Sequence, residues 1–198
     1  MSDVRATLIR TVRRMYERHL TDTAGGNVSA RDGDSIFITP RLSGAKRQWS
    51  ISEEDLIELS YSNPDPNADS RLSREVKVHL ALYRDLPLCG SVIHAHPQHV
   101  QVFVSAGKPI PPATEQTDKF GVIGFVDPAP PHSVDLASNV AAGLKPKAHM
   151  LEKHGAAVLA PRHGIFVVGR DLDDAYDTLE RIDNSARYNL LSKLLVDA

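Results

Sequence analysis

The chain is poor in the features that mark several classes of protein. Its 198 residues include a single cysteine, Cys89, so no internal disulfide can form and nothing in the sequence requires an oxidising compartment. No apolar run is long enough for a signal peptide or a membrane-spanning helix. We therefore expect a cytoplasmic protein that does not use a membrane as a partner.

Charge and glycine spacing argue against two further classes. The formal net charge is only −2, which does not support a broad basic face for nucleic acid. Short basic runs, such as the one around Arg13, are interrupted, although one or two cations suffice for a small anionic substrate. The glycine-rich segment that begins at Gly25 lacks the spacing of a dinucleotide fingerprint or a P-loop, so nucleotide binding of those kinds is not expected.

What remains is the composition of an ordinary globular protein, with 41% hydrophobic and 24% charged residues. The length favours a single domain over residues 1–198, and no internal repeat divides it. Apolar periodicity predicts helices over residues 1–20 (with Ser2 or Asp3 as N-cap), 52–59, 74–84, 98–106, 133–143 and 171–195. Apolar and β-branched runs predict strands over residues 28–31, 35–39, 89–96, 123–126, 156–159 and 164–168. This mixture predicts one layered α/β domain with a mixed or largely antiparallel sheet.

The strongest local signal is the pair His94 and His96 at the end of an apolar strand. Side chains two residues apart in a strand point to the same face, so both imidazoles can converge on one point. Paired neutral imidazoles suit a divalent transition metal. The alternative is two unrelated polar residues where the strand meets solvent, and the motif alone does not decide between them.

A catalytic zinc typically has three protein ligands and an open position, so a third ligand must come from elsewhere. His163 lies in a turn between two apolar strands, and the glycine after it allows the backbone to approach a neighbour closely. By itself, His163 is more often a turn residue than a ligand. Glu75 is explained locally as part of a helix start capped by Ser73, and it gains functional weight only from its companions.

Three loops are rich in small residues and backbone donors. Gly26 and Asn27 lie in the first, Ser43 and Gly44 in the second, and Ser73 in the third. Such loops suit the capture of a phosphate or carboxylate by N–H groups and hydroxyls. Ordinary turn chemistry explains each of them equally well when it is taken alone.

The other histidines lack the spacing of ligands. His99 and His132, like the rest, are interpreted as ordinary surface or core residues. His79 follows Glu75 by one helical turn and can support a site from behind, but the ordinary interpretation is preferred for it as well.

Five segments of this chain occur in the order in which a known family carries them. They are GGNVS at 25–29, ITP at 38–40 followed by Ser43-Gly44, SRE at 73–75 with HLALY at 79–83, VIHAH at 92–96, and RHG at 162–164 before a long C-terminal helix. Five ordered motifs are far more specific than any single one. Over nearly its whole length, the chain resembles the class II aldolase/adducin family.

The resemblance implies a three-layer α/β/α fold and a homotetramer with active sites at subunit interfaces. It implies that His94, His96 and His163 bind one Zn²⁺ per subunit and that Glu75 is the catalytic acid/base. The residues that fall where aldolases of this family hold the substrate phosphate are Gly26, Asn27, Ser43, Gly44 and Ser73.

The implied activity is zinc-dependent cleavage of a small ketose phosphate, such as L-fuculose 1-phosphate. The products are dihydroxyacetone phosphate and an aldehyde, formed through a metal-stabilised enediolate. A carboxylate near the metal moves the proton.

Two departures from the aldolase pattern leave other reactions open. Arg74 replaces a serine, as in family members that decarboxylate 3-oxo sugar-acid phosphates. The aldolases' interfacial tyrosine has no counterpart in 111–116, where Glu115 resembles a glutamate of the methylthioribulose-phosphate dehydratases. A decarboxylase, a dehydratase or an epimerase therefore stands beside the aldolase. A non-catalytic, adducin-like interaction module is a further alternative, against which the complete set of histidines and Glu75 argues.

Overall fold

A six-stranded sheet forms the centre of the molecule, which is described by a computed structural model over residues 3–196. The strands are β1 (Asn27–Asp32), β2 (Ser35–Ile38), β3 (Ile57–Ser60), β4 (Ser91–Ala95), β5 (Ala156–Ala160) and β6 (Gly164–Gly169). Their order across the sheet is β3-β2-β1-β4-β6-β5, and every pairing between neighbouring strands is antiparallel. The predicted largely antiparallel sheet is thus confirmed.

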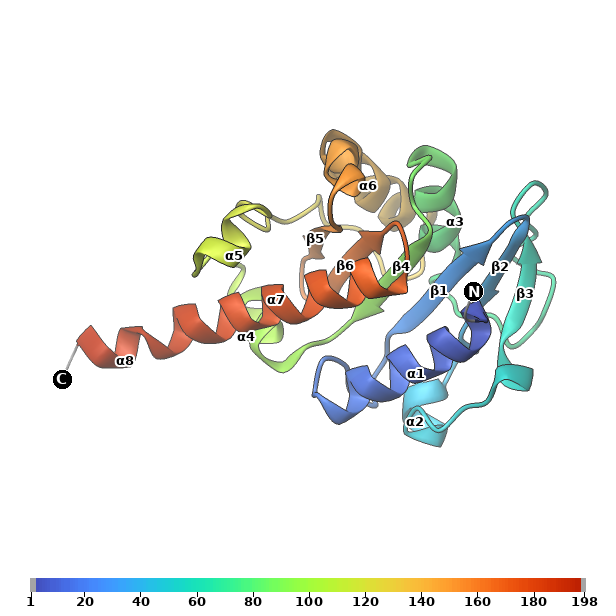
Figure 1. Cartoon of the computed structure of the whole chain (residues 1–198), viewed down its shortest axis with the longest axis horizontal. Coiled ribbons are helices and arrows are strands. Elements are labelled where there is room, and N and C mark those ends of the chain that lie inside the picture. Colours follow the sequence, from blue (N-terminus) through green and yellow to red (C-terminus); the bar gives the residue numbers. More distant parts are fainter. Residues whose placement is uncertain (1–2, 197–198) are drawn as a thin grey trace.

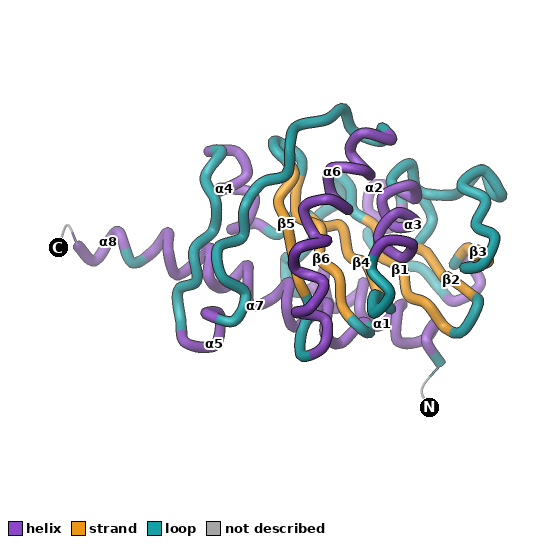
Figure 2. Tube along the Cα trace, turned by 90° about the horizontal axis from the view of Figure 1, so that it is seen from above, coloured by secondary structure: helices purple, strands orange, loops and turns teal. Residues whose placement is uncertain are grey.

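Helices cover both faces of this sheet. The α-helices are α1 (Val4–Glu17), α2 (Ser43–Arg47), α3 (Val76–Asp85), α4 (Gln98–Ala106), α5 (Glu115–Asp118), α6 (Val134–Leu144), α7 (Leu172–Leu191) and α8 (Lys193–Val196), with 3₁₀ segments η1 (Glu53–Asp55) and η2 (Lys145–Glu152). Helices α1 and α7 lie side by side on one face, and α3 and α6 cover the other (Figures 1 and 2). This arrangement is the expected three-layer α/β/α fold. No helix within residues 3–196 is long and apolar enough to span a membrane.

Two hydrophobic cores follow from the alternation of side chains along the strands. In β4, Ile93 packs in the core under α1 and α7, whereas Val92 packs in the core under α3 and α6. His94 takes the same face as Val92 and stacks on Phe166 of β6, with ring centroids 4.3 Å apart. The central strand is therefore buried on both faces, and it carries a polar ring where it reaches the end of the sheet.

Most predicted elements are present with ends shifted by a few residues, but two are wrong. Residues 52–59 form the short η1 turn and then β3, because the alternation of Ile57 and Leu59 lets this segment pair with β2. Ser52 caps only the single turn of η1, where its backbone N–H donates to the Asp55 carboxylate (2.9 Å).

The strand predicted over 123–126 is likewise reduced to two isolated bridges, Ile110 with Ile123 and Phe125 with Leu159. The proline-rich segment 127–131 that follows supplies few backbone donors, so no ladder is extended there. At the start of the chain, the Asp3 side chain caps α1 by accepting from the Arg5 backbone (2.9 Å), while Ser2 lies outside the described residues.

Candidate metal centre

Three histidines meet at one end of the sheet. His94 lies on β4, His96 follows it two residues later, and His163 lies in the turn between β5 and β6. One ring nitrogen from each lies within 4.8 Å of the others. The His94 ring centroid is 5.0 Å from that of His96 and 4.7 Å from that of His163. The predicted convergence of these side chains is what the structure shows.

Hydrogen bonds on the outer side of two rings determine which nitrogens face inward. His94 Nδ1 lies 3.1 Å from the Ile165 carbonyl, which can only accept, so this nitrogen carries the proton. His96 Nδ1 lies 3.3 Å from a carboxylate oxygen of Asp22 in the same way. His94 Nε2 then bears the lone pair, and His96 Nε2 is buried without a hydrogen-bond partner. Oriented imidazoles with unpartnered inner nitrogens are the arrangement that a bound metal ion requires, so these residues fit zinc.

His94 and His163 are kept neutral by their surroundings. Burial, reinforced by the neighbouring His96 and His163, holds the pKa of His94 well below its usual range. Burial, with His96 and His132 nearby, lowers the pKa of His163 to about 4. A neutral imidazole offers a lone pair at pH 7, whereas an imidazolium does not, so no proton has to leave these two rings before a cation binds.

Gly164 makes the close approach of His163 to the strand possible. A Cβ on this residue would lie 2.6 Å from the Ala95 carbonyl oxygen and 2.7 Å from the His96 ring. Both distances are too short for real atoms, so any side chain here would push the turn away from the histidines. The predicted close approach of the backbone after His163 is confirmed.

Glu75 places a buried carboxylate next to the histidines. It lies just before α3, is 3% exposed, and has Oε1 3.7 Å from His163 Nε2. The same oxygen accepts from the His132 backbone N–H (3.2 Å) and lies 2.6 Å from His132 Nδ1. Its other oxygen, Oε2, is buried with no hydrogen-bond partner. Burial raises the pKa of this carboxyl, and His132 opposes the rise.

The candidate phosphate residues gather in the same cavity, whose volume is about 430 Å³. Its lining includes the five predicted phosphate residues, Gly26, Asn27, Ser43, Gly44 and Ser73, beside the three histidines and Glu75. The exposed cations Arg41 and Arg74 line it as well. The cavity therefore combines metal-binding nitrogens, a carboxylate, small polar groups and positive charge.

Glu115 is the predicted site residue that the structure does not bring to this cavity. It is exposed on α5, at the end of the molecule where α7 runs toward α8, whereas α2 with Ser43 lies at the other end (Figure 1). Within one chain, Glu115 does not line the histidine cavity.

Sequence reasoning missed two residues of the site. His132 was interpreted as ordinary, yet it lies on Glu75, and its backbone has φ 66°, a left-handed conformation that is uncommon outside glycine. Asp22 orients His96 and also accepts from the backbone N–H groups of Ala24 and Gly25. Its place before two glycines signals a turn, but nothing local indicates that its carboxylate reaches β4.

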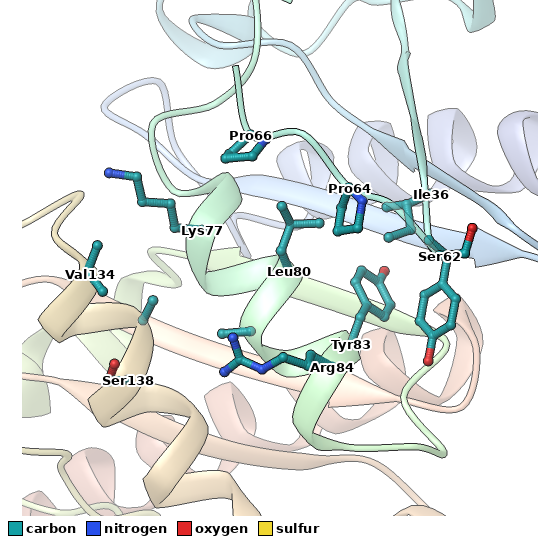
Figure 3. Close-up of a pocket in the computed structure, with 13 residues that line it drawn as sticks. Ile36, Ser62, Pro64, Pro66, Lys77, Leu80, Tyr83, Arg84, Val134 and Ser138 are labelled. Atoms are coloured by element: carbon teal, nitrogen blue, oxygen red, sulfur yellow. The ribbon is translucent and has the colours of Figure 1, made fainter. Parts of the chain in front are cut away.

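A second, larger cavity of about 730 Å³ is separate from this site. It lies between α3, α6 and the loop after β3, and Figure 3 shows Lys77 and Arg84 beside an apolar floor that includes Leu80. None of the predicted site residues lines it, and it carries no cluster of metal-ligating side chains. His99 is not part of the histidine cluster, and its ring pairs with Asp183 at 2.7 Å.

Comparison with known proteins identifies the family of the chain. A sequence model of the family described as Class II Aldolase and Adducin N-terminal domain matches residues 6–190. The chain belongs to this family. The match spans all the strands and all the site residues named above.

Two relatives and one solved structure illustrate the range of the family. The chain is 29% identical over 190 residues to the L-fuculose phosphate aldolase of Methanocaldococcus jannaschii, covering 94% of this chain and 96% of that protein. It is 28% identical over 190 residues to the 3-oxo-tetronate 4-phosphate decarboxylase of Haemophilus influenzae, covering 91% and 83%. Among solved structures, an L-fuculose 1-phosphate aldolase superposes with a TM-score of 0.80 at 25% identity, covering 98% and 88%.

Proposed function

We propose that the chain is a zinc-dependent aldolase, a lyase that cleaves a small ketose phosphate into dihydroxyacetone phosphate and an aldehyde. The observation that carries this proposal is the convergence of three imidazoles with the buried carboxylate of Glu75. Membership of the family and the relationship to aldolases of similar length support it.

His94, His96 and His163 would hold one Zn²⁺ per chain. Nitrogen ligands favour zinc over magnesium, and three of them leave a position for a substrate. When bound, the ion would act as a Lewis acid toward the carbonyl group of the substrate. The absence of cysteine from this cluster argues against a closed structural site.

Glu75 would move the proton. In the cleavage direction, the electron pair of the broken carbon–carbon bond stays on the dihydroxyacetone phosphate fragment, and Glu75 would deliver a proton to that carbon. The buried surroundings that raise its pKa make a proton available on this carboxyl closer to neutral pH than on a solvated one. The His132 backbone N–H holds Oε1, which leaves the unpartnered Oε2 as the oxygen that would face the substrate.

The phosphate of the substrate would bind among the small polar residues that line the cavity. Asn27, Ser43 and Ser73 are buried in this lining, and Gly26 and Gly44 would add backbone groups to it. The Ser43 hydroxyl donates to the Pro40 carbonyl at 2.6 Å, so this serine would contribute through its backbone and by accepting.

A catalytic role for Glu115 would require a neighbouring chain. We propose a homotetramer in which α5 of one chain closes the cavity of the next, because Glu115 is exposed and distant from the cavity of its own chain. In that position it would take the hydroxyl proton that leaves when the aldehyde forms.

Decarboxylation of a 3-oxo sugar-acid phosphate is the second candidate, and one observation favours it. Arg74 lines the cavity directly before Glu75, where a guanidinium can hold a substrate carboxylate. A decarboxylase is also among the relatives. Dehydration and epimerisation use the same site residues, and a non-catalytic module would leave the buried carboxylate unexplained.

The deciding experiment is a panel of ketose 1-phosphates and 3-oxo acid phosphates turned over by the zinc-loaded protein. Dihydroxyacetone phosphate and carbon dioxide are measured together. We expect dihydroxyacetone phosphate without carbon dioxide. Carbon dioxide alone would assign the chain to the decarboxylases, and no product from any member of the panel would favour the non-catalytic module.

A further inference from the structure

A chain of buried hydrogen bonds leads from α3 to the phosphate side of the cavity. The Tyr83 hydroxyl lies 2.8 Å from Ser29 Oγ, which lies 2.6 Å from His79 Nδ1. His79 Nε2 lies 2.5 Å from Asn27 Oδ1, and Asn27 Nδ2 donates to Ser73 Oγ at 2.9 Å. This series of hydrogen bonds thus connects five side chains, and two of them, Asn27 and Ser73, line the histidine cavity.

Every member of this chain is shielded from solvent. His79 and Ser29 are 0% exposed, Tyr83 is 2% exposed, and Asn27 and Ser73 are 4% and 6% exposed. Burial lowers the pKa of His79 to about 3 and raises the pKa of Tyr83 well above its usual range. His79 is therefore neutral with a single ring proton, and Tyr83 keeps its hydroxyl proton.

The proton of Tyr83 sets the direction of the chain. Among the described residues, Ser29 is the one hydrogen-bond partner of the Tyr83 hydroxyl. The ring of Tyr83 forms part of the wall of the second cavity (Figure 3). A buried hydroxyl proton without an acceptor is costly, so Tyr83 donates to Ser29. Ser29 must then use its own proton on His79 Nδ1, which accepts.

The rest of the direction follows from the single proton of His79. With Nδ1 accepting, the ring proton is on Nε2 and is donated to Asn27 Oδ1. The amide nitrogen of Asn27 therefore points to the cavity side, where it donates to Ser73. Ser73 Oγ also accepts from the Glu75 backbone N–H (3.2 Å), so the serine's own proton has no acceptor among the described residues.

The opposite direction leaves groups unsatisfied. If His79 donated from Nδ1 to Ser29, Ser29 would donate to Tyr83, and the buried Tyr83 proton would have no acceptor. The Asn27 amide would also be reversed, and its carbonyl oxygen would face the cavity. The first direction gives Tyr83, Ser29, His79 and the Asn27 carbonyl oxygen a partner each, and it ends in donors at the cavity.

We propose that His79 is a positioning residue that locks the Asn27 amide, so that Asn27 and Ser73 present only N–H and O–H donors to the substrate. A wall of donors suits a fully ionised phosphate, which offers only acceptors at that point, and disfavours a neutral hydroxymethyl group. This inference rests on the proposed function in one respect, namely that the anion is the phosphate of the substrate.

The first test reads the proton on His79 directly. A long-range ¹H–¹⁵N spectrum of the histidine-labelled, zinc-loaded protein distinguishes a ring protonated at Nε2 from one protonated at Nδ1, and loss of one signal in a His79→Gln sample assigns it. We expect the Nε2–H tautomer. The Nδ1–H tautomer would reverse the chain and overturn the inference.

The second test compares two amide substitutions at the same position. The His79→Gln side chain reaches the place of Nε2 and keeps a donor for Asn27, whereas the His79→Asn side chain reaches only the place of Nδ1. Binding of inorganic phosphate to the zinc-loaded variants is measured by calorimetry, and any phosphate held by the metal alone contributes equally to both. We expect binding to be about tenfold weaker in His79→Asn than in His79→Gln.

The two readouts separate this inference from the proposed function. If the native protein binds phosphate and both variants bind it equally, the role of His79 is wrong while the phosphate site stands. If the native protein shows the Nε2–H tautomer but binds no phosphate, the proposed orientation of the Asn27 amide is supported, and the proposal of a phosphorylated substrate is wrong. For turnover, the His79→Asn change should raise KM for a ketose phosphate far more than it lowers kcat, and rescue by His79→Gln excludes a merely structural loss.

Discussion

The two sides of the histidine cavity are built differently. The histidine side rests on the centre of the sheet, where β4 keeps His94 in register with Asn27 of β1 and Phe166 of β6. The other side consists of loops in less common backbone conformations, including Leu42 with φ 65° and His132 with φ 66°. Rigid strands fix where a metal would bind, and the loops determine what else meets the substrate there. We therefore expect the choice of reaction to depend on the loops, and the proposed metal site to depend on the sheet.

The largest effect should come from removing a ligand on the sheet side. His96→Ala should abolish stoichiometric zinc binding and turnover, because two imidazoles cannot replace three. Zinc content after dialysis, measured by atomic emission, checks this. His149→Ala, at an exposed histidine, is the matched control and should keep its zinc. Full zinc occupancy in His96→Ala would mean that His96 is not a zinc ligand.

Glu75→Gln should separate zinc binding from turnover. The amide keeps the shape of the side chain but cannot exchange a proton, so kcat should fall by about 10²- to 10⁴-fold while zinc remains bound. Steady-state kinetics with parallel zinc analysis measures both. Glu152→Gln, at an exposed position, serves as the control. Undiminished turnover in Glu75→Gln would show that another group moves the proton.

A smaller effect is expected from Asp22, which supports the sheet side from a loop. Asp22→Ala removes the acceptor of His96 Nδ1, so the ring loses its fixed orientation. Zinc affinity should fall by about 10- to 100-fold, as is typical when the partner of a ligating histidine is lost. Competition with a chromogenic chelator measures the change. An unaltered affinity would mean that packing alone orients His96.

The smallest effect concerns acid stability. The pKa of His79 is lowered from 6.5 to about 3 in the folded state, so the unfolded chain binds a proton between these pH values and the folded chain does not. The free energy of unfolding should therefore fall as pH falls below 6.5, by at most about 1.4 kcal/mol per pH unit from this residue.

Urea unfolding of the native protein and of His79→Gln at several pH values between 4.5 and 7 isolates this contribution, because the other titrating groups cancel in the difference. The native protein should lose more stability than the variant as the pH falls. Parallel stability curves would mean that His79 is protonated in the folded state, contrary to the buried neutral ring described above.

The sequence predicted the histidine side of the cavity and part of its loops. His94 and His96 share a face because strand side chains repeat every two residues, and Gly164 marks the close approach of the turn that carries His163. The contact of His132 with Glu75 joins residues 57 positions apart through two loops, so no local pattern signals it. The helix predicted over 52–59 failed for a related reason: pairing with β2 decided the structure of that segment against its local signals.

The fold itself was predictable because it depends on repeated patterns. The stripes of α1, α3 and α7 and the apolar runs of β4, β5 and β6 each specify their own element. The order of the five motifs along the chain indicated the family. The position of Glu115 could not be predicted in the same way, because α5 places this residue away from the cavity of its own chain.

The central claim is that three imidazoles of one chain bind a zinc ion beside Glu75, and X-ray absorption at the zinc edge tests it most directly. The zinc-loaded native protein should show one zinc per chain with the outer-shell scattering of three imidazole rings, and His163→Ala should lose one of them. A spectrum with fewer than three imidazoles in the native protein, or one unchanged in His163→Ala, would contradict the account.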